Sequence, residues 1–139
     1  MKRVLILFVV LFVVTSTIAQ QSTVEISDLR VNEHIPGQSV LAGYLTFSNS
    51  SEEALTLLSV EANFADRVEM HQTMNMNGIN QMRPLQSVQI EPGKSVVFEP
   101  GGRHLMIMGV EKSENGAAEL TFYFDNDMVI TQPVEWVAW

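Results

Sequence analysis

Ten short stretches of this chain alternate apolar and polar residues, and turn-forming clusters of Gly, Pro, Asn and Ser separate them. This period-two pattern is typical of half-buried β-strands. Because no long amphipathic helix interrupts the series, the pattern predicts an all-β fold, favouring a Greek-key antiparallel β-sandwich over a parallel α/β fold, with a closed barrel as the alternative. The expected strands are 24–31, 39–48, 55–60, 67–72, 81–83, 88–90, 95–98, 104–110, 118–125 and 128–134.

Apolar residues in two of these stretches predict where the core forms. One set lies near the start of the chain and the other near its end, and each alternates with polar residues. Such alternation gives each strand one apolar face, so we expect the two faces to meet in the interior. The residues concerned are Tyr44, Leu45 and Phe47 with Leu120, Phe122 and Phe124.

The first nineteen residues have the composition of a secretory signal peptide. Two basic residues, Lys2 and Arg3, precede the apolar run 4–14, and small residues stand at Thr17 and Ala19. An uncleaved membrane anchor is the alternative, but it needs about twenty apolar residues and this run is shorter. We therefore predict a signal peptide at 1–19, a single domain at 20–139, and a protein that is periplasmic or otherwise exported.

Charge and the lack of cysteine exclude several functions. Without Lys2 and Arg3 the chain keeps six basic and sixteen acidic residues, a net charge of −10, which argues against binding to nucleic acid or to an anionic membrane. Because there is no cysteine, core packing must stabilise the domain without disulfides, and no lipid can be attached to a thiol. A blue-copper centre is also excluded, since it requires a cysteine thiolate.

Methionine is concentrated in one part of the chain. Six of the eight methionines fall between residues 70 and 108, together with two of the three histidines. Methionine commonly fills gaps in a core, and that explanation stays open for each one. Imidazole and thioether together are also the ligands that suit Cu(I). His34 lies in a predicted loop without methionine at metal-site spacing, so we expect it to be exposed and not a ligand.

Strand geometry brings four of these side chains into two pairs. His104 and Met106 are two residues apart on a predicted strand and therefore share a face. The segment 69–83 is predicted to form a hairpin with its tip at 75–80, with His71 on one arm and Met82 on the other. Met74 and Met76 would lie near that tip, and Met108 follows Met106. These three are candidate auxiliary copper contacts, with loop filling, core packing or a docking patch as alternatives.

The spacing of the four ligand candidates resembles the signature of the periplasmic copper chaperones called PCu(A)C. Ten residues separate His71 from Met82, twenty-one separate Met82 from His104, and one separates His104 from Met106. The surrounding sequence is also similar to that family, in Ala42-Gly43-Tyr44-Leu45-Thr46-Phe47, Met82-Arg83-Pro84 and Glu91-Pro92-Gly93. The resemblance covers nearly all of the predicted domain.

This resemblance implies a cupredoxin-like β-sandwich that binds Cu(I) through His71, Met82, His104 and Met106. It further implies transfer of copper to an acceptor, such as the CuA site in subunit II of cytochrome c oxidase or an assembly factor of that enzyme. Two features depart from the family. Its members often place a methionine close after the first histidine, where this chain has Gln72-Thr73-Met74. Many members also carry a longer His- and Met-rich tail, and none follows Trp139 here. A second, tail-borne site is therefore not expected.

Other functions remain alternatives at this level. Copper scavenging, tolerance or uptake would use the same ligands, and the sequence does not separate them from delivery. A copper-dependent oxidase is less favoured, because catalytic copper sites usually contain more histidines, and no nucleophile motif is present. The methionines could instead form a metal-free recognition surface. We expect a binding protein that is not an enzyme and that is monomeric because of its acidic surface.

Overall fold

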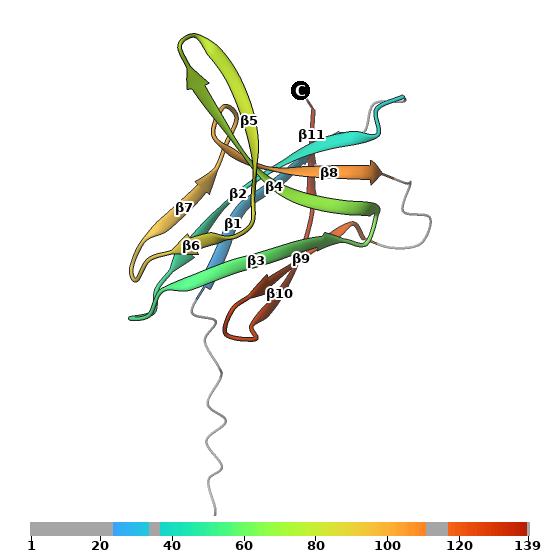
Figure 1. The fold of residues 1–139 in the computed structure, drawn as a ribbon. Coiled ribbons are helices and arrows are strands. Elements are labelled where there is room, and N and C mark those ends of the chain that lie inside the picture. The colour runs from blue at the N-terminus through green and yellow to red at the C-terminus, as the bar shows by residue number, and fades with distance from the viewer. Residues whose placement is uncertain (1–23, 34–36, 111–116, 139) are drawn as a thin grey trace, which may run out of the picture.

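The computed structural model describes residues 24–33, 37–110 and 117–138, which form a sandwich of two β-sheets (Figure 1). The predicted signal peptide and His34 lie outside the described residues. The strands are β1 (Val24–Asn32), β2 (Val40–Asn49), β3 (Leu55–Ala62), β4 (Ala65–Met76), β5 (Ile79–Leu85), β6 (Val88–Ile90), β7 (Ser95–Phe98), β8 (Arg103–Val110), β9 (Glu119–Phe124), β10 (Val129–Pro133) and β11 (Glu135–Val137). Within the described ranges, no helix is long and apolar enough to cross a bilayer.

The strands divide into a seven-stranded and a four-stranded sheet. The larger sheet has the order β11-β1-β2-β7-β8-β4-β5, and the smaller has the order β10-β9-β3-β6. The predicted all-β sandwich is therefore confirmed. One strand was missed: β11 is short and pairs in parallel with β1, Arg30 lying opposite Glu135. Only Val134 separates β11 from β10, and no turn-forming cluster marks its start in the sequence.

Aromatic residues from both sheets pack at the centre of the sandwich. The ring of Phe47 on β2 makes edge-to-face contacts with Phe98, Phe122 and Phe124, at centroid distances of 5.7, 5.4 and 6.0 Å. This geometry suits the quadrupoles of aromatic rings and fixes the spacing between the sheets. The predicted meeting of the two apolar sets is confirmed with one exception. Tyr44 lies on the outer face, where the Arg30 guanidinium stacks over its ring at 5.6 Å.

The β4–β5 hairpin is longer and its turn is tighter than predicted. It projects beyond the body of the sandwich (Figure 1), and its strands pair without interruption from Met70 opposite Leu85 to Met76 opposite Ile79. The expected six-residue tip at 75–80 is wrong, because the turn consists of Asn77 and Gly78 alone. Both have positive φ angles, 56° and 81°, as a two-residue hairpin turn requires.

Candidate metal centre

Pairing between β4 and β8 collects most of the predicted site on one face of the larger sheet. Directly opposite residues of an antiparallel pair point to the same face. Met70 and Leu105 face each other in the core and are buried, so the residues that alternate with them point outward. Three pairs lie side by side on this outer face: Arg67 with Met108, Glu69 with Met106, and His71 with His104.

The two histidine rings are close enough to bind one ion together. Their centroids are 5.9 Å apart and their planes are inclined by 40°. An ion about 2.0 Å from one nitrogen of each ring, the usual metal–imidazole distance, would separate the centroids by about 5 to 6 Å. The distance between His71 and His104 therefore fits shared ligation, and it is set by their direct pairing across β4 and β8.

A tight turn holds His104 in place. His104 is only 8% exposed, and its Nδ1 lies 3.3 Å from the carbonyl oxygen of Gly102. A carbonyl can only accept a hydrogen bond, so Nδ1 carries the proton and Nε2 keeps its lone pair. The same carbonyl accepts a hydrogen bond of 3.0 Å from the backbone N–H of Thr73 on β4. Gly102 thus ties the start of β8 to the strand that carries His71.

A carboxylate holds the other histidine. Glu69 Oε2 lies 2.8 Å from His71 Nε2, and Glu69 Oε1 lies 3.1 Å from Arg67 Nε. The hydrogen bond with His71, followed by the charge of Arg67, keeps the pKa of Glu69 below its ordinary value, although desolvation acts in the opposite direction. Sequence reasoning missed Glu69. Its place two residues before His71 on a strand is the signal that could have found it.

Met82 brings a thioether to the same face from the hairpin. It pairs with Thr73, which alternates with His71 on the outward-facing side of β4. Met82 is 54% exposed. Pro84 is opposite His71 on this face and is also exposed. Met82 therefore lies on the same face as the histidine pair, two residues farther towards the tip of the hairpin.

The two methionines of β8 differ in their partners. Met106 is partly buried and faces Glu69, next to the histidine pair. Met108 lies two residues farther along, and its sulfur is 3.5 Å from Nη2 of Arg67, which donates a weak hydrogen bond to it. Met108 thus shares the face of Met106 but already has a cationic partner, at the end of the row away from His104.

Met74 and Met76 are placed differently from the four ligand candidates. On β4 they alternate with His71 and Thr73, so they point to the opposite face of the hairpin from Met82. This placement follows from the two-residue turn, because uninterrupted pairing keeps each strand's alternation unchanged to its end.

Leu105 and Ile107 alternate with the ligand candidates of β8 and are fully buried in the core. They therefore point away from the histidines and do not form a hydrophobic surround that keeps water from the site.

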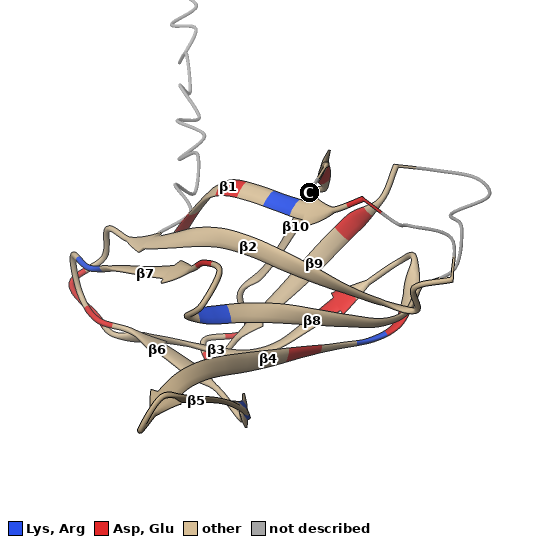
Figure 2. Ribbon diagram, turned by 90° about the horizontal axis from the view of Figure 1, so that it is seen from above, with Lys and Arg blue, Asp and Glu red and all other residues tan. Residues whose placement is uncertain are grey.

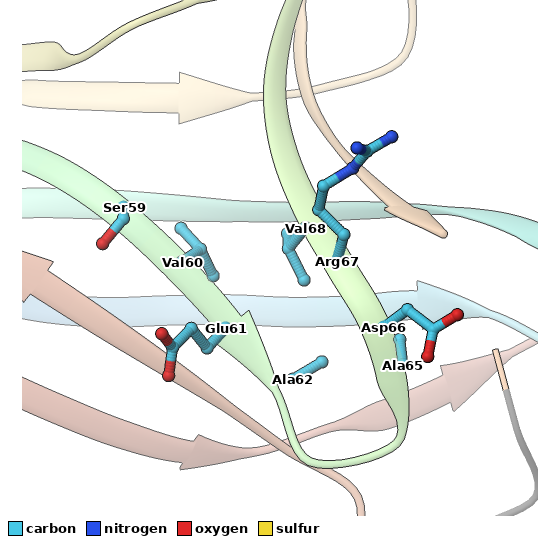
Figure 3. A pocket seen from close by; sticks show the side chains of 8 residues that line it. All are labelled: Ser59, Val60, Glu61, Ala62, Ala65, Asp66, Arg67 and Val68. Atoms are coloured by element: carbon cyan, nitrogen blue, oxygen red, sulfur yellow. The ribbon is translucent and has the colours of Figure 1, made fainter. Parts of the chain in front are cut away.

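A separate cleft opens between β3 and β4. It has a volume of about 440 Å³ and is lined by residues 59–62 and 65–68, with Val60 and Val68 between the two strands (Figure 3). Glu61, Asp66 and Arg67 supply its charged groups.

Figure 2 shows acidic positions spread over both sheets, with few basic ones among them. Among the described residues, no three His, Asp or Glu side chains form a metal-binding group.

Comparison with known proteins places this chain in a family. Residues 24–135 match the family described as "Putative lipoprotein LpqE-like", and the chain belongs to this LpqE-like family. A curated relative, the uncharacterized protein RP573 of Rickettsia prowazekii (strain Madrid E), is 30% identical over 89 residues. That match covers 62% of this chain and 49% of RP573, so the chain spans about half the length of its relative.

Solved structures of PCuAC domains share the fold. The copper-bound PCuAC domain from PmoF2 has a TM-score of 0.67 and 19% identity, covering 84% of this chain and 93% of that domain. Apo-DR1885 from Deinococcus radiodurans has a TM-score of 0.64 and 16% identity, covering 99% of this chain and 94% of DR1885. The predicted resemblance to PCu(A)C proteins and their cupredoxin-like sandwich is therefore confirmed for the fold.

Proposed function

We propose that this protein is an exported Cu(I) chaperone that binds one copper ion through His71, Met82, His104 and Met106. The observation that carries the proposal is the direct pairing of His71 with His104, at a centroid distance of 5.9 Å, on the face that also holds both methionines. Thioether sulfur and neutral imidazole nitrogen are soft or borderline donors and favour Cu(I) over hard cations. The fold is shared with a PCuAC domain solved with copper and, at a TM-score of 0.59 and 18% identity, with CuI-DR1885.

The ligand set suits a carrier that must release its cargo. Two neutral imidazoles and two thioethers leave the charge of Cu(I) uncompensated, so the ion is held less firmly than by thiolates. Met82, at 54% exposure on a projecting hairpin, is the ligand that an incoming protein can replace first. We infer stepwise exchange, in which acceptor ligands replace Met82 first and the more buried His104 releases the copper ion last.

The proposed acceptor is the CuA site of cytochrome c oxidase subunit II or an assembly factor of that enzyme. The lipoprotein description of the LpqE-like family supports export, as does the signal peptide predicted at 1–19. The function is binding and transfer, without catalysis. Copper scavenging, tolerance and uptake would use the same site, and a test of transfer to an apo CuA domain separates them from delivery.

Anaerobic titration of the domain 20–139 with Cu(I), against a competing chelator, tests binding. We expect one tight equivalent, and much weaker binding of Zn(II), because zinc prefers thiolate, carboxylate or several imidazoles. His104→Leu should abolish tight binding, while circular dichroism reports that the fold is retained. Failure of the wild-type protein to compete for Cu(I) would end the chaperone proposal.

Incubation of the copper-loaded protein with an apo CuA domain of subunit II tests delivery. Transfer should appear as loss of copper from the chaperone after separation of the two proteins, and an unrelated apo copper protein serves as the control. Copper retention in the presence of the CuA domain, despite tight binding in the titration, would favour scavenging, tolerance or uptake over delivery.

A further inference from the structure

We infer that Glu69 is a positioning residue that selects Nδ1 of His71 as the copper-binding atom, while His104 binds through Nε2. This inference rests on the proposed function, since it names the donor atoms of that same site. It starts from the contact of 2.8 Å between Glu69 Oε2 and His71 Nε2. A carboxylate accepts hydrogen bonds and cannot donate them, so Nε2 of His71 carries the proton. The lone pair of the neutral ring is then on Nδ1.

The surroundings of Nδ1 agree with a ligand role. This atom is buried and has no hydrogen-bond partner among the described residues. A buried acceptor without a partner is destabilising, so such an atom in a native fold calls for an explanation. A copper ion between His71 and His104 would satisfy it. Binding through Nε2 instead would break the bond to Glu69 and move the proton to Nδ1, where no described acceptor meets it.

The carboxylate is itself held in place. Its second oxygen is 3.1 Å from Arg67 Nε, and Nη2 of Arg67 is 3.5 Å from the sulfur of Met108. Arg67, Glu69 and His71 therefore form a row along β4 beside the row of Met108, Met106 and His104 on β8. Metal-binding histidines usually donate their other ring N–H to such a carboxylate, which fixes the ring and strengthens the donor nitrogen. Met108 acts in this arrangement through Arg67 and not as a ligand.

Nitrogen-15 NMR of the histidine rings tests the assignment, because it distinguishes the two neutral tautomers in both metal-free and copper-loaded protein. We expect His71 to be protonated at Nε2 in both states of the wild-type protein. Glu69→Leu should mix the tautomers in the metal-free protein and weaken Cu(I) binding on the order of tenfold. Glu69→Gln, which keeps an acceptor oxygen, should restore most of the affinity.

A matched control is Glu61→Leu, which removes an exposed carboxylate that accepts a hydrogen bond of 2.9 Å from the Tyr123 hydroxyl in the other sheet. It should leave the tautomer of His71 and the copper affinity unchanged. If His71 in loaded protein is protonated at Nδ1, or if Glu69→Leu tightens binding, the assignment is overturned while the chaperone proposal stands. If the wild-type protein binds no Cu(I), the proposed function fails, and the tautomer in metal-free protein still reports whether Glu69 orients the ring.

Discussion

His71 and His104 are direct partners across β4 and β8, thirty-three positions apart in sequence, with ring centroids 5.9 Å apart. The pairing register of β4 and β8 sets this distance, and no flexible loop is involved. The adjacent core pair, Met70 with Leu105, locks the register, because a slip by one residue would turn the buried side chains of the shifted strand outward. The imidazole pair is therefore as rigid as the sheet that carries it.

Replacing Met82 or Met106 by leucine tests the thioether ligands. Leucine keeps the bulk and apolarity but removes the sulfur, so each variant should lose Cu(I) affinity on the order of tenfold or more and keep its thermal stability. Competition titration with a chelator measures the affinity. Met128→Leu is the control, since Met128 packs against the core and lies outside the proposed set. Unchanged affinity in both variants would make these methionines packing residues.

Leucine substitutions at Met74 and Met76 should have no effect on copper affinity. Both residues point to the face of the hairpin opposite Met82, so neither sulfur joins the histidine pair while the hairpin is intact. The same titration measures the result, with Met82→Leu as the positive control. A loss of affinity comparable to that of Met82→Leu would show that the hairpin rearranges on loading.

Gly109→Ala should destabilise the fold for two reasons. Gly109 has φ of 66°, and a Cβ atom there would overlap the carboxylate of Asp66. Gly93→Ala is a matched control, because Gly93 has φ of 64° but open space around a new Cβ. We expect a loss of about 1 kcal/mol for Gly93→Ala from backbone strain, and about 1 to 3 kcal/mol more for Gly109→Ala from the collision. Urea denaturation measures both, and equal losses would contradict this account.

Asp125 should make the stability depend on pH. Its Oδ1 accepts a hydrogen bond of 3.0 Å from the N–H of Thr56, and mainly for that reason its pKa lies below the ordinary value of 3.8. Ionised Asp125 therefore stabilises the fold above that pH, and the contribution is lost as pH falls through the lower folded pKa. Asp125→Asn should lower the free energy of unfolding at pH 7, and its difference from the wild type should shrink towards about pH 2.

Urea denaturation across this pH range checks the prediction for Asp125. Glu52→Gln, in an exposed turn, is the control and should differ little from the wild type at either pH. A difference between Asp125→Asn and the wild type that stays constant from neutral to acid pH would mean that charge at Asp125 does not contribute.

Much of the architecture was predictable because it depends on local pattern. Alternation placed Leu45, Phe47 and Phe122 in the core, and the structure confirms it. The same rule set His104 and Met106 on one face of a strand. Prediction failed at two points: no turn-forming cluster separates β11 from β10, and Tyr44, which precedes Leu45 on β2, points to the outer face as strand alternation requires.

The sequence by itself determined which side chains of this protein could act as soft ligands and at what spacing they occur, because residue types and strand periodicity are local properties. Only the tertiary structure decided which strands pair, and with that the meeting of His71 with His104 and of Glu69 with Met106. It also placed Met74 and Met76 on the far face, through a turn of two residues where six were expected. Register between distant strands depends on burying one complete face of the sheet, a cooperative property that no single stretch of sequence contains.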